Sequence, residues 1–258
     1  MTFPIPDPTV FLLVLARVGG LVGASPIFGH LLVPVRVRVG FTLVLAAALG
    51  GALGPATAAP PPTIVGLIGA LAVEAALGVA IGLVAQFVFA GVLMGGQLSG
   101  IQMGFGIANL IDPQSHAQVT IVAQWQQLMA FLIFLVLDIH HLLIGALLAS
   151  FHTTPPGSVV LSAVGLRGTI SLAGELFALG VRIAAPVLVA LLLTNAALGI
   201  LARTIPQLNV FVVGFPVNVG VGLLMLGASL PFTFRLLAAR FTALEPTLDS
   251  LVRGFAHG

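Results

Sequence analysis

Cysteine and lysine are both absent from this 258-residue chain, and charged residues of all kinds make up only 6% of it. The absence of cysteine excludes disulfide bonds, thiolate nucleophiles and metal sites with cysteine ligands. All nine basic residues are arginines, too few for the extended basic surface with which proteins bind DNA or RNA. We therefore expect no nucleic-acid partner and no chemistry that depends on cysteine.

Hydrophobic residues take the place of the missing charges. They make up 59% of the chain, whose mean hydropathy is +1.21, whereas a typical soluble domain has roughly 25% charged residues. The composition predicts an integral membrane protein that has membrane lipid as one of its partners.

Six long apolar runs lie between turns that are rich in proline and glycine, and each run suits a helical region. No connecting segment is long enough for a soluble domain, and no repeat of fixed period is present. The sequence therefore predicts an all-α membrane protein with about six hydrophobic helical regions, in a single membrane domain over residues 1–258. The apolar runs are residues 10–28, 39–59, 64–93, 119–151, 170–201 and 210–234.

Two of these regions are too long for one crossing of a bilayer. As unbroken helices, residues 64–99 and 117–151 would each extend about 50 Å, against about 30 Å of hydrocarbon. We therefore expect kinked or broken helices, hairpins of short helices, or helices that project from the bilayer. The expected break in the second region is at Asp138, Ile139, His140 and His141.

Residues 94–116 interrupt the apolar pattern with glycines, amide side chains and one acidic residue. The glycines let the backbone bend, while the remaining side chains keep its surface apolar. Irregular backbone persists at membrane depth only where it is buried in protein or lines a cavity. This stretch therefore predicts a constriction inside an assembly.

Five charged residues lie within the apolar runs, where each is costly unless it faces protein or water. We predict that Arg17, Glu74, Asp138, Glu175 and Arg182 are buried structural charges. Small residues recur every four positions around Glu74, so its carboxylate faces a closely packed helix. A proton relay and a buried interhelical ion pair are both compatible with this pattern, and the ion pair is favoured because no chain of acidic residues accompanies Glu74.

A polar stripe follows the interrupted stretch. His116, Thr120, Gln124 and Gln127 recur at offsets of four, four and three, which places them on one face of a helix. Such a face either lines a hydrated conduit or makes hydrogen bonds between helices, and the pattern favours neither.

Metal and cofactor sites have little support in the sequence. Adjacent histidines on a helix, such as His140 and His141 after Asp138, diverge by about 100°, and the HExxH pattern is absent. We expect these residues to have a structural role at the helix break, with no metal and no cofactor. Residues 104–109 carry only the first two glycines of a dinucleotide fingerprint. Because no serine-based or paired-aspartate site is present either, we expect no enzyme.

Several segments together resemble one known family of membrane proteins. The chain resembles the FliR family, called SctT in virulence systems, over nearly its whole length. It departs from the family at Asp138, where members tend to have an Asn-Gly-His type of turn. The resemblance is carried by Arg17 with Pro26, by residues 33–46, 74–89, 150–157 and 192–221, and above all by GIQMGFGIANLIDPQS at residues 100–115.

The resemblance implies both a fold and an assembly. About residues 1–165 resemble a P-type gate subunit, and residues 166–258 resemble the hairpin of a Q-type subunit. The implied function is that of a non-enzymatic subunit of the flagellar type III protein export gate, in the bacterial inner membrane at the flagellar basal body. The implied partners are FliP-like and FliQ-like gate subunits, an FlhB-like subunit, an FlhA-like ring and unfolded export substrates.

The resemblance also implies a pore plug. Family members place a loop in the closed pore, and the matching positions here are residues 104–113. Apolar side chains in such a loop exclude water and ions, while its glycines supply a hinge. With the methionine that precedes it, the predicted plug or gating loop consists of Met103, Gly104, Phe105, Gly106, Ile107, Ala108, Asn109, Leu110, Ile111, Asp112 and Pro113.

Two other functions remain as alternatives. A secondary transporter for a small solute would have inverted halves with matching broken helices, and the sequence shows no such symmetry. A purely structural scaffold of the gate would use the same loop to fill space between partners.

Overall fold

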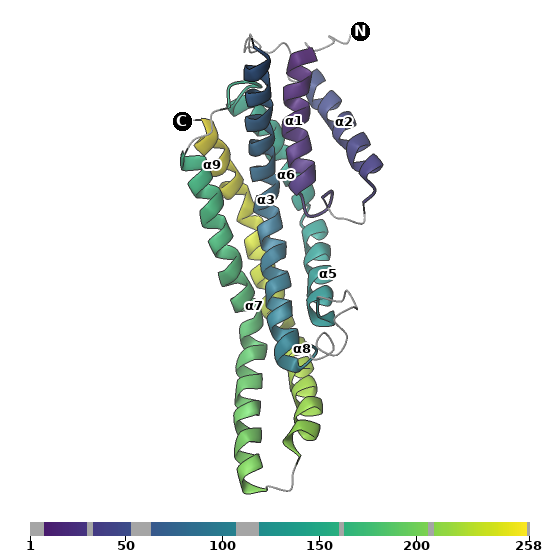
Figure 1. The fold of residues 1–258 in the computed structure, drawn as a ribbon, viewed down its shortest axis with the longest axis vertical. Coiled ribbons are helices and arrows are strands. Elements are labelled where there is room, and N and C mark those ends of the chain that lie inside the picture. Colours follow the sequence, from purple (N-terminus) through teal and green to yellow (C-terminus); the bar gives the residue numbers. More distant parts are fainter. Residues whose placement is uncertain are drawn as a thin grey trace. The chain divides into compact units, whose positions relative to one another are not determined.

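The computed structural model describes residues 8–29, 33–52, 63–106, 119–159, 163–205 and 209–256, and all regular secondary structure in these ranges is helical. The predicted all-α fold is therefore confirmed (Figure 1). The helices are α1 (Pro8–Ala24), α2 (Val35–Ala52), α3 (Ile64–Met103), α5 (Ile121–Val136), α6 (Ile139–Thr153), α7 (Ala163–Thr204), α8 (Val210–Thr242) and α9 (Leu244–Ala256).

Three helical segments in the described ranges are long and apolar enough to cross a membrane: Ile64–Met103, Arg167–Thr204 and Val212–Phe255. The pair α5 and α6 makes a fourth candidate if the two helices form one broken span. The 17 residues of α1 are apolar but reach only about 26 Å, which is less than the roughly 30 Å of hydrocarbon in a bilayer. Within the described ranges, the six apolar regions therefore provide three or four candidate spans.

The two over-long regions behave differently. The 40-residue helix α3 covers residues 64–99 without a helical hairpin and continues to Met103. The region 117–151 breaks where the sequence predicted, because α5 ends at Val136 and α6 begins at Ile139. At the break, Asp138 has φ = 53°, a left-handed conformation that aspartate tolerates better than most residues.

The chain forms two compact units, and both are discontinuous in sequence. The first unit consists of Met1–Phe87, Asp138–Ala173 and Phe241–Gly258, and the second consists of Val88–Leu137 and Gly174–Arg240. The predicted division near residue 165 separates a part that resembles a P-type subunit from a part that resembles a Q-type subunit. The division into compact units does not test this resemblance, so it stays a prediction.

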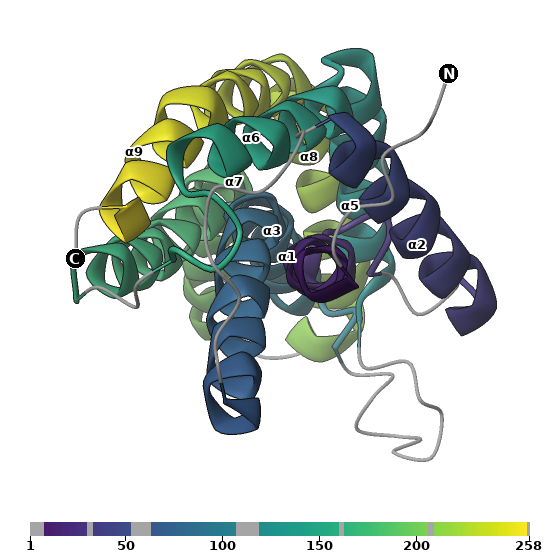
Figure 2. The same ribbon diagram turned by 90° about the horizontal axis from the view of Figure 1, so that it is seen from above.

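In the first unit, α1 packs closely against the N-terminal part of α3 through glycines. A Cβ atom at Gly78 would overlap the carbonyl oxygen of Arg17, and one at Gly20 would overlap the carbonyl oxygen of Ala75. Small residues at four-residue spacing allow this backbone-to-backbone approach. Figure 2 shows α1 between α3 and α2, and α6 beside α9.

The amphipathic helix α9 completes the first unit. Its apolar face is buried, and the ring of Phe255 lies against Gly165 at the start of α7. Two of its three charged residues, Asp249 and Arg253, form an exposed ion pair of 2.8 Å on the opposite face. The buried residues of α9 are Leu244, Leu248, Leu251, Val252 and Phe255.

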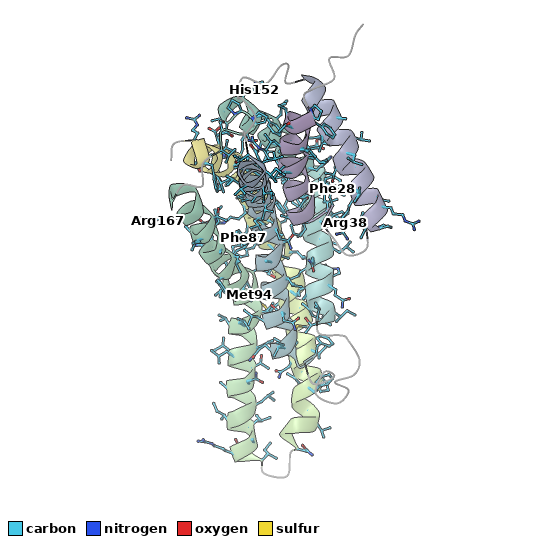
Figure 3. The ribbon with its side chains drawn as sticks, turned by 45° about the horizontal axis from the view of Figure 1, so that its top comes forward. Phe28, Arg38, Phe87, Met94, His152 and Arg167 are labelled. Carbon is cyan, nitrogen blue, oxygen red and sulfur yellow. The ribbon has the colours of Figure 1, made fainter. Side chains whose placement is uncertain are left out.

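The second unit contains the C-terminal part of α3, which α5 and α7 contact. Figure 3 labels Phe87, the last α3 residue of the first unit, and Met94, which lies two helical turns further on. Gly95 faces the carbonyl oxygen of Gly180 on α7 so closely that a Cβ atom would lie 2.8 Å from it. On the α5 side, Phe89 and Phe134 meet edge to face with ring centroids 5.6 Å apart.

Candidate functional site

A buried ion pair joins α1 to α3 in the first unit. The Nε of Arg17 donates to the Oε2 of Glu74 across 2.6 Å, and the two side chains are 0% and 1% exposed. The other carboxylate oxygen, Oε1, accepts a hydrogen bond of 2.8 Å from the backbone N–H of Gly157. Both oxygens of the buried carboxylate therefore have donors, which such a group requires.

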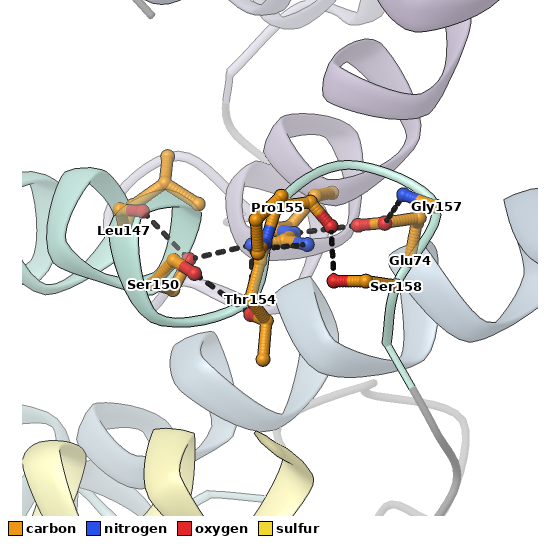
Figure 4. Close-up of polar contacts among 8 residues, drawn as sticks. Glu74, Leu147, Ser150, Thr154, Pro155, Gly157 and Ser158 are labelled. Atoms are coloured by element: carbon orange, nitrogen blue, oxygen red, sulfur yellow. Dashed lines mark hydrogen bonds and ion pairs between the residues drawn. The ribbon is translucent and has the colours of Figure 1, made fainter. Parts of the chain in front are cut away.

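The rest of the Arg17 guanidinium is bound by the end of α6. Its Nη1 donates to the Oγ of Ser150 at 3.1 Å and to the Oγ1 of Thr154 at 3.3 Å, and its Nη2 donates to the carbonyl oxygen of Thr154 at 3.0 Å. The guanidinium also lies over the ring of Phe151, 4.2 Å from the ring centroid. Figure 4 shows Ser150 and Thr154 close together, with Glu74 facing Gly157.

This polar network ties three segments of the first unit together: α1, α3 and the connection from α6 to α7. Glu74 is its one carboxylate among the described residues, so the network has the form of a clamp rather than of a relay along a series of acids. Sequence reasoning singled out Arg17 and Glu74 but missed the hydroxyl partners. The available signal was the four-residue spacing of Ser150 and Thr154, which places them on one helical face.

In the second unit, the end of α3 is closed by a well-formed C-cap. The N–H of Gly104 donates to the carbonyl oxygen of Ile101, and the N–H of Phe105 donates to that of Gly100, both at 3.0 Å. Gly104 has φ = 101°, a conformation that favours glycine. Together these features form a Schellman motif, which satisfies carbonyl groups at the helix end.

The capped end of α3 is packed into the core of the second unit. Met103 is fully buried in a cluster with Val122, Val187 and Leu191, and Phe105 packs against the same cluster. Gly222 on α8 leaves the space that the Met103 side chain occupies, because a Cβ atom there would lie 2.5 Å from it. Of the predicted plug, residues 103–106 thus form an anchored helix end, and residues 107–113 lie outside the described ranges.

The three described members of the predicted polar stripe differ in exposure, and the role of the stripe stays a prediction. Thr120 is buried and caps α5, accepting from the N–H of Ala123, while its own N–H donates to the Oε1 of Gln97 on α3 at 2.9 Å. Gln124 is exposed and Gln127 is half-buried. Thr120 therefore makes hydrogen bonds between helices, and His116 lies outside the described residues.

Three of the five embedded charges are exposed in the single chain, so the predicted burial of all five in an assembly stays a prediction. The Asp138 side chain is 71% exposed because it lies at the helix break. The Glu175 side chain is 58% exposed and pairs with Arg240 on α8 at 2.8 Å, a partner on another helix as the spacing indicated. Arg182 is exposed on α7. Only Arg17 and Glu74 are enclosed, because α1, α3 and the end of α6 meet around them.

Asp138, His140 and His141 gather at the break between α5 and α6. Each offers one potential metal ligand atom within 4.8 Å of the others. The Asp138 carboxylate lies 3.4 Å from the Nδ1 of His141, and the two imidazole rings are 4.1 Å apart. All three residues come from four consecutive positions and two of them are exposed, so the expected structural role without a metal stays a prediction.

The comparisons with known proteins agree on one family. The model of a family described as bacterial export proteins, family 1, matches residues 9–244. The chain belongs to this family. The resemblance to FliR proteins is thereby confirmed, and the matched range contains the buried network, the capped end of α3 and the Asp138 break.

Individual FliR relatives match most of the chain. The flagellar biosynthetic protein FliR of Escherichia coli (strain K12) is 36% identical over 218 residues, which cover 84% of this chain and 82% of the relative. The FliR protein of Bacillus subtilis (strain 168) is 34% identical over 94% of each chain. That of Aquifex aeolicus (strain VF5) is 28% identical over 93% of this chain and 92% of the relative.

Proposed function

We propose that this FliR-family chain is a subunit of the flagellar type III protein export gate. With FliP-like and FliQ-like subunits it forms the channel in the bacterial inner membrane through which unfolded flagellar proteins leave the cell. An FlhB-like subunit and an FlhA-like ring at the flagellar basal body are its further partners. The chain is not an enzyme, and the energy for export comes from other components of the apparatus.

The observation that carries the proposal is the anchored end of α3. The Schellman motif and the burial of Met103 hold the start of residues 104–113 against the second unit. The segment that follows contains Ile107, Leu110 and Ile111, whose apolar side chains suit a seal that excludes water and ions. An anchored entry and an apolar continuation are what a plug that closes a pore requires.

Deletion of residues 104–109 tests the plug. In gates assembled from the full set of subunits and reconstituted into planar bilayers, the deletion is expected to raise ion conductance at least several-fold, because the apolar seal is lost. The substitution Gly106→Ala is the matched control, because it changes the same segment at a position with no positive φ, where a new Cβ would make only ordinary van der Waals contacts with Ile101. Equal conductance of the deletion and the intact gate would contradict the plug.

The scaffold alternative is favoured by one observation, the packing of Phe105 against the buried cluster of the second unit. A segment that only fills space should lose its partners when its apolar side chains are truncated. The double variant Phe105→Ala and Leu110→Ala separates the two functions: a scaffold loses co-purifying P-type and Q-type subunits, whereas a plug assembles normally and leaks. Solute uptake by the chain alone in liposomes would instead favour a secondary transporter.

A further inference from the structure

An apolar groove with one arginine at its edge lies between α7 and α8 in the second unit. Its volume is about 470 Å³. The α7 wall includes Pro186, Val189 and Leu193, and the α8 wall includes Met225 and Phe232. Arg182 is the one charged residue that lines it.

The charge of Arg182 is not neutralised within the part of the chain that the structure describes. Its guanidinium makes no ion pair or side-chain hydrogen bond there. The acidic residue nearest to it on α7 is Glu175, two helical turns away, and the Glu175 carboxylate is already bound by Arg240 at 2.8 Å. An arginine on an apolar span is costly unless an anion or water compensates it. The groove thus presents an uncompensated positive charge beside an apolar surface.

Arg182 offers guanidinium donors at the edge of the groove, while the rest of the groove offers only apolar contacts. A ligand that satisfies both has a negatively charged head and an apolar body.

The groove runs along α7, so the apolar part of its ligand should be an extended chain. Arg182 and Leu193 are eleven positions apart on α7, which is about 16 Å at 1.5 Å per residue. A chain of this reach extends from the charged edge along the apolar wall. Because α7 is a membrane-span candidate, the surrounding medium itself supplies molecules of this kind.

We propose that this groove binds an anionic phospholipid, whose phosphate pairs with the guanidinium of Arg182 and whose acyl chain lies along Val189, Leu193 and Met225. Guanidinium groups bind phosphate through paired hydrogen bonds, and this geometry favours arginine over lysine. A zwitterionic lipid leaves the charge only partly compensated and should bind less well.

Native mass spectrometry of the full-length protein, purified from membranes together with its partner subunits, tests the site. Each sample is incubated with phosphatidylglycerol or phosphatidylcholine of identical acyl chains. The intact protein is expected to retain at least five-fold more phosphatidylglycerol than phosphatidylcholine, and Arg182→Gln is expected to lose this preference. Arg203→Gln is the matched control, because it removes an exposed arginine from the end of the same helix and leaves the groove intact.

Two more variants keep the test decisive if Arg182→Gln does not fold. Ala190→Phe fills the groove while it retains the charge, and it is expected to reduce bound phosphatidylglycerol. Arg182→Lys retains a point charge and is expected to keep part of the preference. Unchanged phosphatidylglycerol binding in both Arg182→Gln and Ala190→Phe would overturn the proposal. Unchanged lipid binding with loss of a co-purifying subunit would overturn it too, because it would assign Arg182 to a carboxylate of a protein partner.

Discussion

The Nε of Arg17 and the Oε2 of Glu74 are 2.6 Å apart, although the two residues are 57 positions apart in the chain. Both side chains are enclosed: Ser150 and Thr154 bind the guanidinium, and the backbone N–H of Gly157 binds the carboxylate. A buried pair of this kind specifies which segments meet, because a mispaired arrangement would leave a charge without a partner.

Removal of one member of this pair should be far more damaging than removal of both. Glu74→Gln is expected to destabilise the full-length chain by about 3–5 kcal/mol, because the Arg17 charge stays buried without its counter-ion. The double variant Arg17→Met, Glu74→Leu should recover most of that loss. Thermal unfolding in detergent, monitored by circular dichroism, measures the midpoints of the single and the double variant. The exposed pair of Asp249 and Arg253 is the control, and Asp249→Ala should leave the midpoint unchanged within error.

The hydroxyl of Thr154 should contribute to the same clamp. Thr154→Ala removes an acceptor of the Arg17 guanidinium and is expected to cost about 1–2 kcal/mol. Its neighbour Thr153 is exposed and bonds only the carbonyl oxygen of Ala149 within α6, so Thr153→Ala should change stability little. Equal unfolding midpoints for the two variants would show that the guanidinium does not depend on Thr154.

The left-handed turn at Gly104 should tolerate no other residue. Gly104→Ala places a Cβ at φ = 101° and 2.9 Å from the ring of Phe215, so it is expected to cost about 1–3 kcal/mol. At Gly106 the nearest heavy atom to a new Cβ is 3.5 Å away, and Gly106→Ala should be neutral or slightly stabilising. Chemical denaturation of both variants compares the two glycines. A Gly104→Ala chain as stable as the Gly106→Ala chain would contradict the Schellman anchor.

The break between α5 and α6 should accept glycine in place of Asp138. Because Asp138 has φ = 53°, Asp138→Gly relieves backbone strain and is expected to raise stability by about 0.5–1 kcal/mol. A β-branched residue cannot adopt this conformation easily, so Asp138→Val should lower stability by about 1–3 kcal/mol. The loss of the exposed contact with His141 is common to both variants and cancels in their comparison. A reversed order of the two midpoints would show that the left-handed backbone at residue 138 does not govern the stability of the break.

Several features of the fold followed from local pattern. The apolar runs predicted an all-α protein, and the Asp-Ile-His-His sequence located the break at Asp138. The four-residue spacing of small residues around Glu74 indicated a close helix neighbour, which is α1. Patterns of this kind are readable because the helical period places residues four apart on one face.

Other features could not be read from local pattern. Arg182 and Glu175 share a helix and similar apolar surroundings, yet Glu175 has a partner on α8 and Arg182 borders a groove. Met103 precedes the predicted plug, and Thr120 belongs to a stripe for which a conduit wall and interhelical hydrogen bonds were equally compatible with the spacing; both residues are buried in the second unit. Their burial depends on packing contacts with α7, α8 and the end of α3. The spacing of residues within one segment does not encode such contacts.

The sequence by itself determined the membrane character, the helical fold and the membership of the FliR family. Hydropathy, the helical spacing of residues and sequence motifs are all properties of short segments, so they can be read without the tertiary structure. Only the tertiary structure decided which charges are enclosed and with whom they pair. The Arg17 guanidinium is bound by residues 57 to 137 positions away. Such a partnership exists only when the packing of α1, α3 and α6 removes water from the site, and that packing is a property of the whole unit.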